Sequence, residues 1–253
     1  MSKIGVNEIF TEISSALDKA QNIWNKVKDE FIVEASRPNI LKSLDIDSDI
    51  PGHRSVNPDV PEVGQFIAFV LDIRDSSIHL TQAIDAKVSQ LERVYYETTA
   101  INTLGGLVMS EYDGSITEYL GDGFLALFLV KDEKEKSVVS DASNAANEII
   151  ENGLLIVNNI LKMRYSLPPL SVGIGMAYSK AVVTTVGYGG QSHPKAIGQC
   201  VFRAAKLSDG IDAVRVDDCL EHLWPTGKNP KISFRTIGKY DFKGFELSRL
   251  KRK

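Results

Sequence analysis

A continuous apolar run that ends in an acid constrains this chain more than any other feature. Residues 66–71 read Phe-Ile-Ala-Phe-Val-Leu and are followed at once by Asp72. An unbroken apolar run of this length is typical of a strand buried on both faces of a sheet. A carboxylate after such a run is costly to bury unless it reaches the sheet edge or meets a cation. We therefore expect a central strand whose end presents Asp72 at the edge of a sheet.

The rest of the chain alternates helical and strand patterns. Apolar residues at three- and four-residue steps predict helices at residues 6–34, 81–102, from about 137 to 163, and 199–208. Short apolar runs predict strands at residues 107–112, 115–120, 124–130, 171–178, 181–187, 232–236 and 245–250. Gly105 and Gly106 are expected to end the second helix, and residues 171–187 are expected to form a hairpin. This order predicts an α+β, ferredoxin-like fold with an antiparallel-rich sheet, covering helices and an N-terminal helical extension.

The N-terminal quarter differs from the remainder. Residues 1–62 are expected to be an amphipathic helix and a linker, and residues 63–253 a catalytic domain. Four prolines in residues 37–64 predict a loop or extended linker there. The helix at residues 6–34 either packs on its own domain or contacts a second copy, and its pattern fits both equally.

Composition excludes several classes of protein. The 253 residues carry 29 Lys+Arg and 33 Asp+Glu, a formal net charge of −4, which argues against a general nucleic-acid binder. Two cysteines cannot form a disulfide framework. No apolar run approaches membrane-spanning length, and the first residues lack a signal-peptide pattern, so we expect a cytoplasmic protein with no membrane partner.

Two aspartates are the best candidates for chemistry. Asp72 ends the buried strand, and Asp122 lies between Gly121 and Gly123 in a turn. If the two strands are neighbours, both carboxylates meet at one edge, and oxygen ligands without Cys or His suit Mg²⁺ or Mn²⁺. Each motif alone has a plainer explanation, since Asp often caps a helix and Gly-Asp-Gly is a common turn.

The motifs taken together resemble those of class III nucleotidyl cyclases. They are residues 69–77 (FVLDIRDSS), 118–128 (EYLGDGFLALF), 172–187 (glycine-bounded), 198–207 (GQCVFRAAKL) and 242–245 (FKGF). The likeness covers about residues 65–250 in consistent order. The DIRxS sequence and the departures described below also resemble the pyrimidine (uridylate and cytidylate) cyclases of Pycsar-type anti-phage systems.

The resemblance implies a homodimer with active sites in the interface. One chain would supply the Asp72 and Asp122 side chains and the Ile73 carbonyl to two divalent cations. Backbone amides around Ser76 and Ser77 would hold phosphate. Two divalent cations of this kind neutralise a triphosphate and activate a hydroxyl for in-line displacement.

The other chain would clamp the triphosphate, with departures from the family pattern. Lys243 matches the family's tail lysine. Where the family's helix presents Asn and then Arg four residues later, this chain has Phe202 and Lys206. Lys206 donates hydrogen bonds from a compact ammonium group, whereas arginine binds phosphate with two parallel N–H groups. Arg203 is an alternative replacement for the missing guanidinium. Phe202 either narrows the pocket or stacks on a base, or it packs in the core.

The family reads its base from two positions that match Glu118 and Lys195. A carboxylate accepts from an imide N–H and a lysine donates to a ring carbonyl, which fits uracil and guanine rather than adenine or cytosine. Phe202 in place of a small amide favours the smaller ring, uracil. Glu118 as a plain exposed strand residue is the alternative.

The sequence thus predicts an enzyme that converts UTP to 3′,5′-cyclic UMP and pyrophosphate. The resemblance implies a signal in anti-phage defence that a separate effector responds to. A guanylate cyclase and a catalytically inactive nucleotide-binding dimerisation module are the alternatives. Nucleic-acid binding ranks last, because the basic residues gather at one tail without an aromatic platform.

Overall fold

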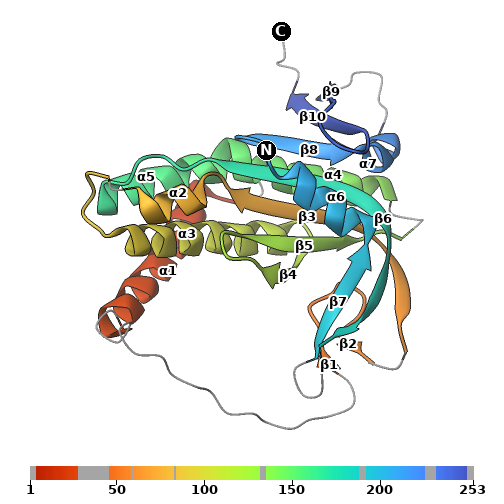
Figure 1. Ribbon diagram of the computed structural model, residues 1–253, viewed down its shortest axis with the longest axis horizontal. Coiled ribbons are helices and arrows are strands. Elements are labelled where there is room, and N and C mark those ends of the chain that lie inside the picture. Colours follow the sequence, from red (N-terminus) through yellow and green to blue (C-terminus); the bar gives the residue numbers. More distant parts are fainter. Residues whose placement is uncertain are drawn as a thin grey trace.

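The computed structural model describes residues 4–27, 46–57, 60–82, 84–131, 135–187, 192–225 and 232–249, which form helices around one large mixed sheet (Figure 1). The helical elements are α1 (Val6–Val27), α2 (Ser76–Thr81), α3 (Gln90–Glu111), α4 (Glu135–Glu148), the π-helical turn η2 (Ile149–Gly153), α5 (Leu154–Tyr165), α6 (Gln199–Leu207) and α7 (Asp218–Leu223). The strands are β1 (Ile46–Asp47), β2 (Ser55–Val56), β3 (Glu62–Ile73), β4 (Ser115–Tyr119), β5 (Gly123–Leu129), β6 (Val172–Val186), β7 (His193–Gly198), β8 (Ala213–Asp217), β9 (Ile232–Ile237) and β10 (Gly244–Arg249).

The large sheet is mostly antiparallel, and the predicted α+β fold class is confirmed. Its strand order is β4-β5-β3-β6-β8-β10-β9, with β7 paired to β6. The described pairings are antiparallel except for β6 with β8. The acid-terminated run of residues 66–72 lies in β3, between β5 and β6 near the middle of the sheet.

Strand β3 is buried on both faces, which explains its lack of alternation. Odd residues from Ile67 to Ile73 face the core beneath α1, α3, α4 and α5. Even residues from Phe66 to Val70 face a smaller core on the other side, which α6 covers. Both faces of this strand therefore need apolar side chains.

Helix α1 packs on its own domain, the first of the two alternatives. Ile9, Ile13 and Leu17 are at most 1% exposed and belong to the larger core. Val6 and Phe10 on the same helix remain 64% and 46% exposed. The remainder of the predicted helix, beyond residue 27, lies outside the described residues.

Part of the expected linker is ordered structure. Strands β1 and β2 pair as a short hairpin, with Ile46 opposite Val56. Ile50 and Val56 are 3% and 4% exposed and join the smaller core with α6. The proline-rich composition hid this hairpin, because its two-residue strands carry no periodicity of their own.

Helix α3 corrects two expectations at once. It begins at Gln90 with a Ser89 capping box and continues through Gly105 and Gly106 to Glu111. The predicted helix end at these glycines and the predicted strand at residues 107–112 are therefore wrong. Gly105 is required by packing, because a Cβ there would lie 2.2 Å from the Phe124 ring.

The two neighbouring glycines give a matched test of this packing. We expect Gly105→Ala to lower the free energy of unfolding by about 1–3 kcal/mol, since it overpacks the core. Gly106→Ala meets no atom within 4 Å, so it should raise that free energy by about 0.5–1 kcal/mol through helix propensity alone. Urea unfolding of both variants measures the difference. Equal effects in both variants would contradict the packing explanation.

The hairpin predicted within residues 171–187 is also wrong. Those residues form one long strand, β6, and the hairpin partner is β7 further along the chain. The polar pair Ser179 and Lys180 suggested a turn, but both stay in the strand opposite Phe66 and Gln65 of β3. Pairing along the length of β3 overrides the local polarity.

Among the residues that the structure describes, none of the helices combines the length and the apolar composition that a membrane span requires.

Candidate active site

The two candidate aspartates lie at the same end of two neighbouring strands, Asp72 within β3 and Asp122 in the turn directly before β5. Asp72 of β3 is opposite Gly123 of β5, and the Ile73 amide donates to the Asp122 carbonyl at 3.0 Å. A Cβ at Gly123 would lie 2.0 Å from the Leu71 carbonyl oxygen, so only glycine allows this close approach. The turn at residues 120–123 thus places Asp122 beside the end of β3.

Each carboxylate already has a polar partner. The Arg74 guanidinium forms an ion pair with Asp72, whose side chain is 29% exposed. The Ser76 hydroxyl donates to Asp122 Oδ2 at 2.5 Å. Two partly exposed carboxylates, one of them paired with a cation, form a site that favours positive charge. Its oxygen-only donor set fits a hard divalent cation such as Mg²⁺ or Mn²⁺.

The chain turns sharply immediately after Asp72. Asp75 adopts a left-handed conformation with φ 59°, and α2 begins at the next residue. Ser76 is half-buried and faces Asp122, whereas Ser77 is exposed. Only the turn at Arg74 and Asp75 therefore separates the predicted phosphate-contacting residues from the strand that carries Asp72.

Glu118 and Lys195 form an ion pair between β4 and β7. Their side chains are 27% and 34% exposed, so Glu118 is not a plain exposed strand residue. A break in the β4–β5 register falls between Ile116 and Glu118. Bulges of this kind redirect side chains, and they often occur next to active sites.

A cavity of about 410 Å³ contains this pair. Its other walls include Tyr119, His193 and the backbone turn of residues 47–50 from the β1–β2 hairpin. The contribution of residues 47–50 to this cavity was not predicted from the sequence, because these residues were assigned to a linker. The two aspartates that flank one serine, Asp47 and Asp49, were the only sequence signal for it.

Helix α6 presents the predicted site residues Phe202, Arg203 and Lys206, and Lys243 directly precedes β10. Phe202 is 65% exposed, so the alternative of core packing is wrong for this chain. Lys206 forms an ion pair with Asp241 at 2.9 Å, and its side chain is 55% exposed. Lys243 is exposed, and its carbonyl accepts from the Asp218 amide at 3.1 Å.

Arg203 has partners within its own chain. Its guanidinium donates to Asp217 at 3.0 Å and to Asp218 at 3.1 Å, and it lies 4.9 Å from the centre of the Phe242 ring. Asp217 is fully buried and also accepts from the Leu220 amide, which caps α7. The structure therefore gives Arg203 a supporting role under α7, and a catalytic role would require it to leave a buried carboxylate.

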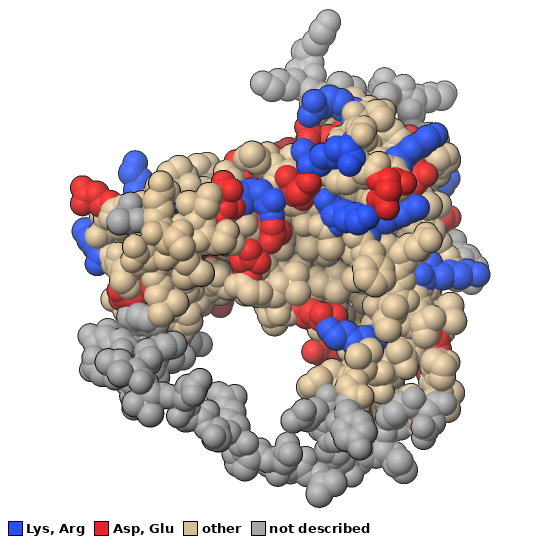
Figure 2. Space-filling model, in the orientation of Figure 1, with Lys and Arg blue, Asp and Glu red and all other residues tan. Residues whose placement is uncertain are grey.

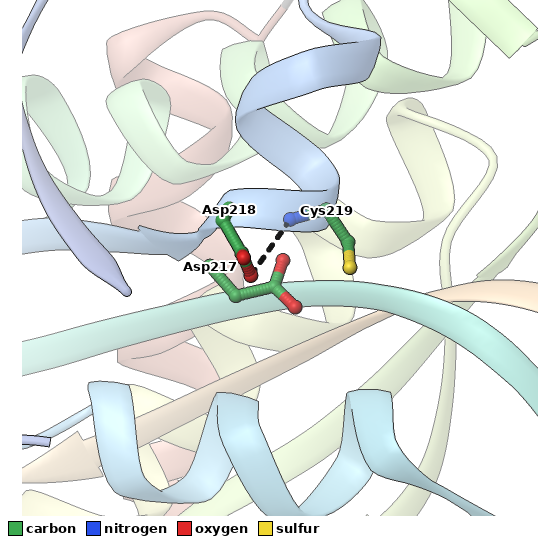
Figure 3. A group of neighbouring side chains, drawn as sticks. All are labelled: Asp217, Asp218 and Cys219. Atoms are coloured by element: carbon green, nitrogen blue, oxygen red, sulfur yellow. Dashed lines mark hydrogen bonds between the residues drawn. The ribbon is translucent and has the colours of Figure 1, made fainter. Parts of the chain in front are cut away.

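Asp217, Asp218 and Cys219 form the acidic cluster shown in Figure 3. Their ligand atoms lie within 4.8 Å of one another where β8 meets α7. Burial raises the pKa of Asp217, although its hydrogen bonds and Arg203 act in the opposite direction. Asp217 is fully buried, and its two oxygens already accept from Arg203 and from the Tyr178 and Leu220 amides, so we interpret the cluster as a charged support for α7 rather than a second metal site.

Lys and Arg side chains gather around β8, β10 and α6, interspersed with acidic side chains (Figure 2). Asp209 is an example: it pairs with Arg215 at 2.5 Å and also with Lys239. Its pKa lies below the ordinary value, because the contacts with Lys239, Tyr240 and Arg215 outweigh its burial. Much of this positive charge is therefore neutralised within the chain.

The fold is similar to that of several solved nucleotidyl cyclases. The adenylyl cyclase CyaB from P. aeruginosa matches with a TM-score of 0.62 and 14% identity over 76% of this chain and 98% of that one. The guanylate cyclase domain of RhGC from Catenaria anguillulae, in complex with GTP, gives 0.53 and 14% over 75% and 100%. A non-canonical dimeric guanylyl cyclase domain of the RhoGC fusion protein from Blastocladiella emersonii gives 0.54 and 12% over 76% and 98%.

These likenesses define the architecture as that of class III nucleotidyl cyclase catalytic domains. No protein-family model matches the sequence. No curated protein matches it significantly. At these identities the comparison shows the fold, and the chemistry depends on the residues described above.

Proposed function

We propose that this protein is a nucleotidyl cyclase that converts UTP to 3′,5′-cyclic UMP and pyrophosphate. The observation that carries the proposal is that Asp72 near the end of β3 and Asp122 directly before the neighbouring strand β5 are brought together by backbone pairing on a cyclase fold. A signalling role in anti-phage defence, with a separate effector, rests on the sequence resemblance alone, whereas the preference for uracil also uses the chemistry of Glu118, Lys195 and Phe202.

The reaction joins two parts of one nucleotide. The ribose 3′-hydroxyl loses its proton to solvent, its oxygen forms a bond to the α-phosphorus, the bond from that phosphorus to the bridging oxygen breaks, and pyrophosphate leaves. Asp72, Asp122 and the Ile73 carbonyl would hold two divalent cations, which supply charge neutralisation and lower the pKa of the attacking hydroxyl. Lys206 and Lys243 would stabilise the charge that develops on the leaving group.

A homodimer completes the site in this proposal. The metal carboxylates of one chain would face the base-reading pair and α6 of the other. The exposure of Phe202 and Lys206 is compatible with such a role, since neither is committed to the core of its own chain. One of the similar structures is a non-canonical dimer of a guanylyl cyclase domain and another form of that domain is monomeric, so the proposed interfacial arrangement rests on the sequence resemblance.

The base would lie in the cavity that contains Glu118 and Lys195. Glu118 would accept from an imide N–H, and Lys195 would donate to the adjacent carbonyl. Guanine and uracil both present this pattern. Phe202 favours the smaller uracil ring, and guanylate cyclase activity is the second candidate, since the same pair of side chains fits guanine.

The deciding experiment offers each of the four nucleoside triphosphates with Mn²⁺ or Mg²⁺ and identifies the products by mass. Cyclic UMP as the main product supports the proposal. Cyclic GMP as the main product would show that the preferred base is guanine, and the proposed mechanism would stand. Nucleotide binding without product from any of the four would support the inactive dimerisation module.

Loss of the base-reading carboxylate should relax this selectivity. We expect Glu118→Ala to lower kcat/KM for the preferred nucleotide about 10²-fold or more. The imide N–H of the base would lose its acceptor, and the Lys195 ammonium would lose its ion-pair partner. ATP should be affected much less. Glu12→Ala on the exposed side of α1 removes the same charge and serves as the control. An equal loss for all four nucleotides would contradict a base-reading role.

A further inference from the structure

Helix α2, which follows the candidate metal strand, has almost no apolar anchor. Ile78 and Leu80 are 47% and 46% exposed, and none of its residues is fully buried. Its two least exposed side chains, Ser76 and His79, are three residues apart and share one face of the helix. Apolar burial therefore contributes little to holding this short helix in place.

A buried charged network in α3 meets that face. His79 Nδ1 lies 2.7 Å from Glu97 Oε2, and Arg93 Nε donates to Glu97 Oε1 at 2.8 Å. The side chains of Glu97 and Arg93 are only 2% and 5% exposed, and that of His79 is 12% exposed. Polar contacts with a buried carboxylate in such surroundings are strong and directional.

The same face of α2 contacts the candidate metal site at its other end. Ser76 donates to Asp122, so helix α2 itself links two separate contacts: the contact of His79 with the Glu97–Arg93 pair of α3, and the contact of Ser76 with a carboxylate of the site. Contacts behind a ligand fix its orientation and raise its affinity for a cation.

We propose that Glu97 and His79 are positioning residues of the candidate active site. They hold α2 against α3, so that Ser76 keeps the Asp122 carboxylate in the orientation that a divalent cation needs. The inference rests on the proposed function only in assigning the cation site to Asp122. Arg93 and Glu97 lie outside the five cyclase-like motifs of the sequence.

His79→Phe tests this inference directly, because it removes the contact with Glu97 and leaves Glu97 paired with Arg93. We expect Mn²⁺ affinity of the full-length protein, measured by the resonance of free Mn²⁺, to fall about 10-fold. Amide hydrogen exchange in residues 76–81 should accelerate, whereas exchange in β3 and β5 should not change.

Ser76→Ala and the double variant show whether the two residues act in series. Ser76→Ala should weaken Mn²⁺ binding about 10-fold, and adding His79→Phe should then cause little further loss. Asn158→Ala removes hydrogen bonds to the Leu170 backbone at 2.9 and 3.0 Å and is the control for general destabilisation. It should leave Mn²⁺ affinity unchanged.

Three outcomes would overturn the inference: unchanged Mn²⁺ affinity in His79→Phe, unchanged exchange in α2, or additive losses in the double variant. Failure of the proposed function has a different signature. In that case the wild-type protein makes no cyclic nucleotide, whereas the exchange measurement still reports whether His79 holds α2.

Discussion

Replacing Asp72 or Asp122 by asparagine is expected to reduce kcat/KM for cyclisation by at least about 10³-fold, equivalent to about 4 kcal/mol of transition-state stabilisation. Each substitution keeps the side-chain volume and removes the negative charge that a divalent cation needs. Alanine at either position should abolish turnover. Initial rates of pyrophosphate release at saturating Mn²⁺ measure the effect.

Two controls separate chemistry from folding. The thermal midpoints of both asparagine variants should stay close to wild type, because the carboxylates are partly exposed at the sheet edge. Mixing Asp72→Asn with Lys206→Ala subunits should restore about a quarter of the wild-type rate, since half of the dimers are mixed and each has one intact site. Appreciable activity in Asp122→Ala alone would reject the assignment.

The largest effect on stability is expected at Asp217. Asp217→Ala removes the cap of α7, leaves the Tyr178 and Leu220 amides without their acceptor and leaves Arg203 with Asp218 alone, so the free energy of unfolding should fall by about 2–4 kcal/mol. Asp218→Ala is the matched control. Its side chain is 32% exposed, and loss of its ion pair should cost about 0–1 kcal/mol. Guanidinium unfolding of both variants measures the difference, and equal losses would contradict the account.

The same contact has a pH signature in Arg203→Leu. Burial raises the pKa of Asp217 above the ordinary value of 3.8, so the native state holds this proton more tightly than the unfolded state does. The contribution of Asp217 to stability is therefore fully present below pH 3.8 and falls as the pH rises through the native pKa. Without Arg203 the charged form loses its cation, and the variant should lose more stability at neutral pH than in acid.

The sequence pattern within a single element was sufficient to predict several strands and one helix. The run of residues 66–72 predicted β3 because burial on both faces requires apolar side chains, and the strands at residues 115–120 and 124–130 correspond to β4 and β5. The periodicity of residues 199–208 predicted α6 to within a residue.

The sequence pattern gave wrong predictions where a residue is determined by a contact with a distant part of the chain. Gly105 suggested a helix end, but it is a glycine because the Phe124 ring packs against it. Lys180 suggested a turn, but it lies in a strand because it pairs with β3. The partners of Arg203 and the contact of His79 with Glu97 cross between elements, so no spacing in the sequence reports them.

Crystals grown with Mn²⁺ and a UTP analogue that cannot cyclise test the central claim most directly. Anomalous diffraction should show two manganese peaks in contact with the carboxylates of Asp72 and Asp122, with the triphosphate of the analogue beside them. Bound nucleotide with no manganese at these carboxylates, or with manganese only at the cluster of Asp217, Asp218 and Cys219, would contradict the account.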